Sequence, residues 1–323
     1  MMDKPVVSIK CTVFNQEKYL RQCLDGFVMQ RTNFPFEAIV HDDASTDHSA
    51  DIIREYAEKY PNIIKPIYEK ENQWTKHDGS MERIIAQQCR GKYIAFCEGD
   101  DYWTDPYKLQ KQVDYLESHP DVVLCTHTFL IFDQKSKTFY DNRFANYPFI
   151  RENDQWVYYF DLNNYWKRWA VQPLSSMYRN LPCIKDLPRN KYKYFYDVTY
   201  YYYYLKLSGG KGVLLKDDMG VYRSANGVWA SKSTEEQFKF RYQQAYKIYE
   251  LEGDRRCLYD CCLTQWNYVL FLIHKRQIKE ALQIYMGIRK LGMDYFLIFT
   301  GWVIKYILLY PFRKMKRLIF NIR

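Results

Sequence analysis

The chain has 323 residues, 47% of them hydrophobic, which is enough for one large α/β domain with an appendage or for two modest domains. Its net charge of +9 does not indicate nucleic acid, because no nucleic-acid motif accompanies it and six basic residues, with no acidic one, stand between Lys305 and Arg323. Its nine cysteines lack zinc spacing, Cys257, Cys261 and Cys262 have no nearby histidine, and no signal segment begins the chain, so we expect a reducing, cytoplasmic setting.

Strands and helices alternate through the first third of the chain. A β-branched run at residues 6–13 predicts a strand, and an amphipathic pattern then predicts a helix to residue 30. The same patterns predict further strands at 36–40, 63–68 and 92–97 and further helices at 49–59, 81–89 and 109–117. Such alternation is typical of βαβ units, so the predicted fold class is α/β, with a mostly parallel sheet flanked by helices.

The rest of the chain is less regular. We expect a strand within 122–132, aromatic loops and short helices from 133 to 174, a helix at 192–207 and a strand at 212–215. From residue 235 to the end the pattern is mostly helical. We therefore divide the chain into a large domain, residues 1–230, and a helical C-terminal region, residues 231–323.

Two acidic clusters follow predicted strands, namely Asp42-Asp43 and the segment from Glu98 to Asp101. Because open parallel sheets bind ligands at the carboxyl ends of their strands, both clusters are expected at one edge. Asp100 and Asp101 fit a Mg²⁺ or Mn²⁺ ion bound together with a diphosphate, since hard cations take oxygen ligands. Glu98 completes an acid-x-acid pattern that could ligate the ion directly or through water.

Three other features of the sequence have ordinary structural interpretations. Asp105 and Pro106 predict the N-cap and the first residue of the helix that follows. His41 and His48 are expected in a strand-end loop rather than in a zinc site, because no further ligand is near. The segment 209–212 lacks the spacing of a phosphate-binding loop and predicts a turn.

Three segments carry a family resemblance: VSIKCTVFN at 7–15, VHDDASTD at 40–47 and GKYIAFCEGDD at 91–101. In order and spacing they resemble glycosyltransferase family 2, densely over residues 5–125 and more loosely to about 230, and most closely the members that assemble bacterial polysaccharides. The resemblance implies a GT-A fold, a nucleoside-diphosphate sugar as donor, usually a UDP-sugar, and inversion at the anomeric carbon.

The resemblance also implies roles for single residues. Thr12 and Phe14 fall where the family contacts the base, and the Phe14 ring could stack on uracil. Asp43 matches the carboxylate that accepts a hydrogen bond from the uracil N3–H. Asp100 and Asp101 match the motif that handles the diphosphate and its Mn²⁺ or Mg²⁺.

Further donor contacts come from more loosely matched positions. Arg83 stands near a basic position of the family, Arg223 could neutralise the leaving diphosphate, and Trp229 could stack on a sugar ring. The full donor-binding set that we expect is Thr12, Phe14, Asn15, Glu17, Asp42, Asp43, Arg83, Glu98, Gly99, Asp100, Arg223 and Trp229, with Asp100 and Asp101 at the metal.

An inverting transfer also needs a base that removes the proton from the acceptor hydroxyl. In the family this carboxylate lies at a helix start about a hundred residues beyond the metal motif, and Asp197 resembles it. The alternative is that Asp197 only caps its helix. Asp217 and Asp218 are rival carboxylates, but they precede what resembles the following strand.

The sequence therefore predicts a metal-dependent inverting glycosyltransferase that transfers a sugar to a glycan or lipid-linked acceptor in cell-surface polysaccharide or glycolipid assembly. A catalytically degenerate, membrane-associated scaffold is the alternative, and the intact carboxylates argue against it. Nucleotidyl transfer is disfavoured because that chemistry needs a glycine-rich loop after the first strand, where this chain has residues 13–16, Val-Phe-Asn-Gln.

The segment 295–310 is apolar, interrupted by Lys305 and ended by Pro311. Sixteen residues are short for a membrane span, which needs about twenty, so we expect an interfacial helix on the inner face of the cytoplasmic membrane. A helix packed on the catalytic domain or in a dimer interface remains the alternative.

Overall fold

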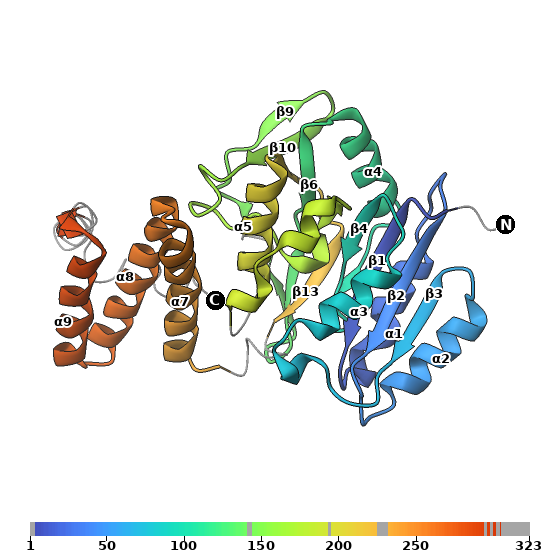
Figure 1. Ribbon diagram of the computed structural model, residues 1–323, viewed down its shortest axis with the longest axis horizontal. Coiled ribbons are helices and arrows are strands. Elements are labelled where there is room, and N and C mark those ends of the chain that lie inside the picture. The colour runs from blue at the N-terminus through green and yellow to red at the C-terminus, as the bar shows by residue number, and fades with distance from the viewer. Residues whose placement is uncertain are drawn as a thin grey trace. The chain divides into compact units, whose positions relative to one another are not determined.

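The computed structural model describes residues 4–140, 144–192, 195–224 and 232–293, together with 296–297, 300–301 and 304. The chain divides into two compact units (Figure 1), one formed by residues 1–165 and 169–226 and the other by 166–168 and 227–323. The domain boundary that we placed at residue 230 falls in 225–231, outside the described residues.

The first third of the chain forms the alternating elements that its periodicity predicts. They are β1 (Val7–Val13), α1 (Glu17–Val28), β2 (Phe36–Asp42), α2 (Ser49–Lys59), β3 (Ile64–Tyr68), α3 (Ser80–Gln88), β4 (Tyr93–Phe96) and α4 (Lys108–Ser118). The apolar face of α1 buries Leu20, Leu24 and Phe27, which recur at helical spacing. The start of α4 differs from our prediction: its N-cap is Tyr107, and Asp105 instead accepts a hydrogen bond from the Tyr107 amide at 2.7 Å.

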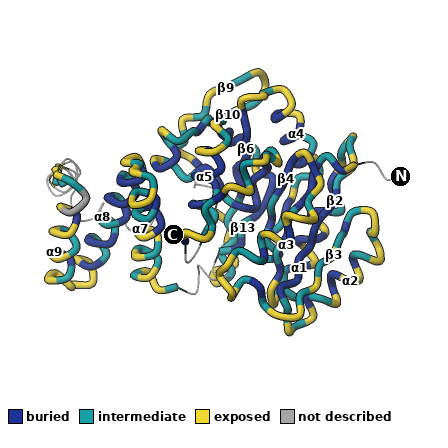
Figure 2. The backbone as a smooth tube through the Cα atoms, viewed as in Figure 1, coloured by how far each residue is buried: buried dark blue, intermediate teal, exposed yellow. Residues whose placement is uncertain are grey.

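A nine-stranded sheet forms the core of the first unit, in the order β3-β2-β1-β4-β11-β6-β12-β10-β9. Here β6 is Val122–His127, β9 is Ile150–Glu152 and β12 is Lys211–Leu215. The strands β3, β2, β1 and β4 are parallel neighbours, and β6 pairs in parallel with β12. Within the described sheet only β11 (Met177–Arg179) and β10 (Gln155–Phe160) run against β1. The mostly parallel α/β class is confirmed, and Figure 2 follows its buried strands through the unit.

The segment 133–174 is more ordered than we expected. It contains strands β8 (Thr138–Tyr140), β9 (Ile150–Glu152) and β10, and β10 pairs antiparallel with β12 (Lys211–Leu215). In β10 the exposed Trp156 is followed by the buried Val157, and Phe160 is also buried. The loop prediction was wrong here because scattered aromatic residues obscured this short strand.

The helix predicted from residue 192 begins later, at Asp197, and runs to Ser208 as α5. A short 3₁₀ turn, η5 (Arg189–Lys191), precedes it. Tyr201, Tyr202 and Tyr204 of α5 are almost fully buried. Several of the chain's 32 tyrosines therefore belong to the core and are not available to a ligand.

A second sheet has the order β5-β13-β7-β8. Its central strand β13 (Gly220–Ser224) pairs with β5 (Tyr102–Trp103) and, in parallel, with β7 (Leu130–Asp133), which follows β6 (Val122–His127). The β5 strand begins directly after the second acidic cluster. The pairing therefore brings a strand from residue 220 onward beside Asp100 and Asp101.

The second unit is helical, as the sequence predicts. It contains α7 (Thr234–Glu252), α8 (Leu258–His274) and α9 (Ile278–Gly287). Ser233 and Glu236 form a capping box at the start of α7, and Arg241 of α7 donates two hydrogen bonds to the buried Asp260 of α8 at 3.1 and 2.6 Å. No helix among the described residues is long and apolar enough to cross a membrane. The interfacial helix predicted at 295–310 lies mostly outside those residues.

Candidate active site

The predicted acidic cluster is present at the carboxyl end of β4. Glu98, Asp100 and Asp101 each offer a carboxylate oxygen, and these oxygens lie within 4.8 Å of one another. No other group of three or more acidic, histidine or cysteine ligands occurs in the part of the chain that the structure describes. The strands β3, β2 and β1 follow one another across the sheet in reverse chain order, and β4 lies on the other side of β1. Open α/β sheets bind their ligands at such a change of direction in the strand order.

Burial disfavours ionisation of all three carboxyls, and neighbouring negative charge adds to this effect at Glu98 and Asp101. Burial, together with the charges of Asp100 and Asp197, raises the pKa of Glu98 from 4.5 to about 8. Burial also raises the pKa of Asp100, and burial with the Asp100 charge raises that of Asp101 well above its ordinary value. One Asp101 oxygen, Oδ2, is buried without a hydrogen-bond partner. Three closely spaced carboxyls that resist ionisation without a positive partner, one of them with an unsatisfied oxygen, fit a divalent cation.

Arg223 of β13 fixes the loop that carries these carboxylates. Its amide donates to Asp101 Oδ1 at 2.8 Å, and its guanidinium donates to the Asp100 carbonyl and to the Gln22 side chain. The guanidinium also lies over the Tyr102 ring, 4.4 Å from its centroid. Arg223 is 5% exposed, so this geometry gives it a positioning role in the loop, while the diphosphate contact stays a prediction.

Gly99 is held in a space that admits no side chain. A Cβ at this position would lie 2.2 Å from Gln16 Oε1, an oxygen that is buried without a hydrogen-bond partner. The Gly99 amide donates to the Thr12 carbonyl at 3.1 Å. The end of β1 and the acidic loop after β4 are therefore packed directly on each other, as a shared donor site requires.

Asp43 has both carboxylate oxygens occupied by backbone donors. The amide of Gln73 donates to Oδ1 at 2.7 Å and the amide of Trp74 donates to Oδ2 at 3.0 Å. These bonds attach the 3₁₀ turn η1 (Trp74–Lys76) to the end of β2. The preceding Asp42 is buried, which raises its pKa, and its Oδ1 has no partner. A carboxylate can accept more than two hydrogen bonds, so these contacts leave room for a nucleobase. The hydrogen bond from a nucleobase to Asp43 stays a prediction.

The loop after β1 is tied to the loop after β2. Asn15, at a positive φ of 54°, accepts from the Thr46 amide at 2.8 Å, and Glu17 accepts from the His48 amide at 2.9 Å. The Phe14 side chain is 47% exposed beside them. An exposed ring on a loop held by these hydrogen bonds suits stacking on a planar nucleobase, and that role stays a prediction.

Asp197 is the first residue of α5, and Tyr196 is the N-cap. Asp197 Oδ1 accepts a hydrogen bond from the Val198 amide at 2.8 Å, so the carboxylate also satisfies a donor in the first turn of this helix. The Asp197 carboxylate lies close enough to the acidic cluster for its charge to raise the pKa of Glu98. Of the rivals, Asp217 forms a 2.6 Å ion pair with Lys111, and Asp218 is exposed.

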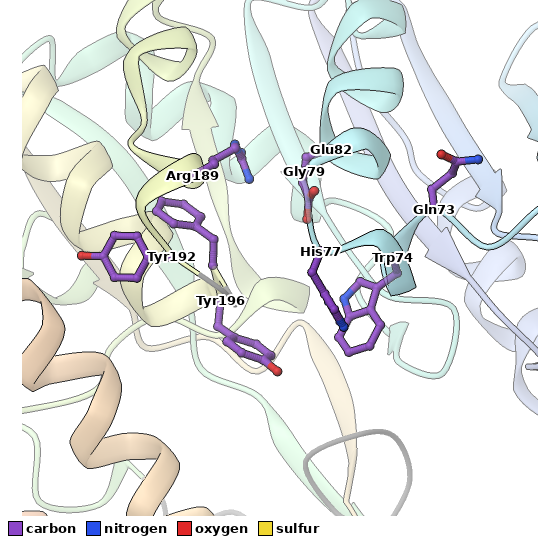
Figure 3. Close-up of a pocket in the computed structure, with 9 residues that line it drawn as sticks. Gln73, Trp74, His77, Gly79, Glu82, Arg189, Tyr192 and Tyr196 are labelled. Atoms are coloured by element: carbon purple, nitrogen blue, oxygen red, sulfur yellow. The ribbon is translucent and has the colours of Figure 1, made fainter.

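An open pocket lies between η1 and α3 on one side and the segment that leads into α5 on the other (Figure 3). Trp74 and His77 form one wall, with ring centroids 4.9 Å apart, and Tyr192 and Tyr196 stand opposite them. The remaining lining residues are Gln73, Gly79, Glu82, Arg189 and Phe195. Since Tyr196 directly precedes Asp197, the pocket borders the candidate base.

Sequence reasoning missed Lys10, a basic residue inside the apolar strand β1. Its amine lies 4.7 Å from the centroid of the Phe96 ring. Burial lowers its pKa, and the charges of Glu82 and Glu98 oppose that shift while Arg189 adds to it. Lys10 thus interacts electrostatically both with the pocket residues Glu82 and Arg189 and with Glu98 of the acidic cluster. The lysine's position in a strand otherwise made of apolar and small residues was the signal that could have found it.

The donor contacts expected of Arg83 and Trp229 stay predictions. Arg83 is exposed on α3, and its guanidinium donates to the Asp78 carbonyl at 2.5 Å. Gly79 of the pocket is near enough that an added Cβ would lie 3.3 Å from Arg83 Nη1. Trp229 lies outside the described residues, so its sugar contact stays a prediction.

Residues 8–179, more than half of the chain, match the family model described as glycosyl transferase family 2. The chain belongs to this family. An uncharacterised protein of Mycobacterium tuberculosis is 38% identical over 231 residues, which cover 71% of this chain and 62% of that protein. The chain therefore matches less than two thirds of the length of that relative.

Solved structures share the fold. Staphylococcus aureus TarS, residues 1–349 in complex with UDP, aligns with a TM-score of 0.52 at 17% identity, over 79% of this chain and 70% of that one. The mannosyltransferase PcManGT of Pyrobaculum calidifontis, in complex with GDP-Man and Mn²⁺, aligns with a TM-score of 0.53 at 13% identity, over 98% and 85%. The first unit therefore has the GT-A-like α/β fold that the sequence resemblance implies.

Proposed function

We propose that this chain is an inverting glycosyltransferase that moves a sugar from a nucleoside diphosphate, with UDP as the expected carrier, to an acceptor hydroxyl. The observation that supports this most is the group of carboxylates of Glu98, Asp100 and Asp101, whose oxygens lie within 4.8 Å of one another. The charge of Asp197, at the start of α5, contributes to the raised pKa of Glu98. A carboxylate near a site suited to a diphosphate supports the role of Asp197 as the base. The expected product is a glycan or glycolipid of the cell surface, which the family resemblance supports.

In this proposal the acceptor hydroxyl attacks the anomeric carbon while Asp197 takes its proton, and the nucleoside diphosphate leaves from the opposite face of the sugar. Inversion follows from that single displacement. Phe14 stacks on the base, and the loops braced by Asn15 and Asp43 hold the nucleotide in place. Binding in a fixed geometry supplies much of the rate, because the two reacting atoms are held at attack distance.

Asp100 and Asp101, with Glu98, are proposed to hold Mn²⁺ or Mg²⁺. The unsatisfied Asp101 Oδ2 and the close spacing of the three carboxylates support that fit. A bound divalent ion supplies positive charge that stabilises the leaving diphosphate. The test of the function is UDP release from a panel of UDP-sugars with and without Mn²⁺ or Mg²⁺; if no nucleotide sugar is turned over or bound, the degenerate scaffold becomes the better account.

Metal binding is expected to strengthen as the pH rises toward 8. Without metal, Glu98 keeps its proton at neutral pH because its pKa is raised to about 8, so a cation must displace that proton. The raised pKa stabilises the metal-free fold fully below pH 4.5, and this contribution is lost as the pH rises through about 8.

Saturating Mn²⁺ should therefore raise the Tm more at about pH 8.5 than at about pH 6, by a few degrees in thermal denaturation. The Glu98→Gln variant, which cannot titrate at this position, should reduce the difference between the two pH values. An equal Tm increase at both pH values in the native protein would contradict the proposed ligand role of Glu98.

The pocket in Figure 3 is proposed to receive the transferred sugar. The Trp74→Ala variant should then bind UDP as the native protein does but bind the matching UDP-sugar about tenfold more weakly, because ring stacking on the sugar is lost. Calorimetric titration with UDP and with the UDP-sugar separates the two affinities. Trp156→Ala, which removes a 47% exposed tryptophan in β10, is the matched control. Equal losses for both ligands would place the nucleotide, not the sugar, at Trp74.

We also propose that the protein works at the inner face of the cytoplasmic membrane, where lipid-linked acceptors are found. The basic segment from Lys305 to Arg323 supports this location, since anionic lipid attracts such clusters. The apolar segment 295–310 would lie in the interface beside it.

A further inference from the structure

The net positive charge of this chain arises from its C-terminal part. Residues 275–323 hold eleven basic and two acidic side chains, a net charge of +9 that equals the net charge of the whole chain. The preceding 274 residues are balanced, with 36 basic and 36 acidic side chains. The charged part begins directly before α9, well ahead of the terminal cluster.

Helix α9 has one covered face and one open apolar face. Ala281 is 3% exposed and Ile288, just after the helix, is 1% exposed on the covered face. Ile278, Leu282 and Met286 are 51%, 58% and 51% exposed. Their spacing of four residues puts these three side chains on the same side of the helix, away from the covered one.

Large apolar side chains stay exposed beyond α9. Met293 is 49% exposed, Leu297 62% and Ile304 51%, and their spacings of four and seven again fit one helical face. Ile273, at the end of α8, is 44% exposed. Single exposed apolar residues are common on soluble proteins, but a series along consecutive segments marks an interaction surface.

Basic side chains accompany this apolar face. Lys275, Arg276 and Lys279 are exposed before and within the first turn of α9, and Arg289 is exposed just after the helix. Apolar side chains on one face with lysine and arginine nearby are the pattern of helices that lie in a membrane interface. Long basic side chains can keep their charged ends at the lipid headgroups while their stems cover apolar surface.

We infer that the apolar face of α9, formed by Ile278, Leu282 and Met286, enters the headgroup layer of an anionic bilayer, held there by the basic residues of 275–323. This inference rests on the proposed membrane location but not on the proposed chemistry. A second copy of the chain fits less well, because a symmetric contact through α9 would bring two segments of +9 together. The lipid-binding surface thus includes helix α9 as well as the terminal basic segment.

The test uses the full chain with the paired substitution Leu282→Gln and Met286→Gln. In sedimentation with vesicles of phosphatidylglycerol and phosphatidylcholine, the variant should partition at least about tenfold more weakly than the native protein. Ile150→Gln, which removes a 54% exposed apolar residue of β9, is the matched control and should bind as the native protein does. Vesicles of phosphatidylcholine alone should bind the native protein weakly, because the attraction to anionic lipid is absent.

The possible results separate the ideas. Native binding by the α9 variant, together with loss of binding on deletion of residues 295–323, would overturn the role of α9 and leave the membrane location standing. No binding of the native protein to anionic vesicles would overturn both. A native protein that is dimeric in light scattering and a monomeric α9 variant would assign the face to a second copy instead. UDP release in detergent-free buffer, measured for every variant, reports separately on the proposed chemistry and on folding.

Discussion

Replacing Asp197 with Asn is expected to reduce sugar transfer by a factor of about 10³ while leaving the affinity for UDP within about twofold of the native value. General-base catalysis contributes about 10²–10⁴ to such reactions, and Asn keeps the size of the side chain but cannot accept the proton. Turnover is measured as acceptor glycosylation, and UDP affinity by calorimetry. A fall in kcat with unchanged UDP binding is the signature of a group that acts on the acceptor.

The structure offers a matched control for this substitution. Asp217 is a rival carboxylate from the same part of the chain, and its 2.6 Å ion pair with Lys111 gives it a structural partner outside the cluster. Asp217→Asn should therefore transfer at near the native rate. Native transfer by the Asp197→Asn variant would remove Asp197 as the base, and a large loss in the Asp217→Asn variant would point to the rival.

Strands and helices could be predicted where the hydrophobic residues of the chain recur at a regular spacing. In the first third, each buried strand is a short apolar run and each helix repeats its apolar residues at helical spacing, so the strands β1 to β4 and the helices α1 to α4 were predicted within a few residues. The two-residue strand β5 was not predicted. Beyond residue 130 the strands β8, β9 and β10 are short and rich in partly exposed rings. Their pairing depends on contacts distant in sequence, such as that of β10 with β12, and no local pattern reveals it.

The candidate site was predictable where the chemistry is local. The cluster of Glu98, Asp100 and Asp101 was predicted as a unit because all three follow one strand. The pocket walls were not predicted, because Trp74 and Tyr196 come from segments more than a hundred residues apart. The contacts of Arg223 also arise from sheet pairing: β13 pairs with β5, and this carries the guanidinium to the Asp100 carbonyl.

Asp101→Asn is expected to abolish metal-stimulated UDP release, with a loss of about 10³ or more, without unfolding the protein. The asparagine carbonyl can still accept the hydrogen bond that the Arg223 amide donates to Asp101 Oδ1 at 2.8 Å. Its amide nitrogen would replace Oδ2, the oxygen left without a partner, and would present a donor where a cation needs an acceptor.

Stability distinguishes this loss of metal from a loss of fold. Burial and the charges of the cluster raise the pKa of Asp101 well above its ordinary value, so ionising it in the metal-free protein costs stability, and that cost grows as the pH rises. The Asp101→Asn variant avoids this cost, and its Tm in chelator should equal or exceed the native value at alkaline pH. Mn²⁺ should raise the Tm of the native protein and of Asp105→Asn, a control in the adjoining turn, but not that of Asp101→Asn. An Asp101→Asn variant that is stabilised by Mn²⁺ as strongly as the native protein would contradict the assignment of Asp101 to the metal, because the ion would then bind without this carboxylate.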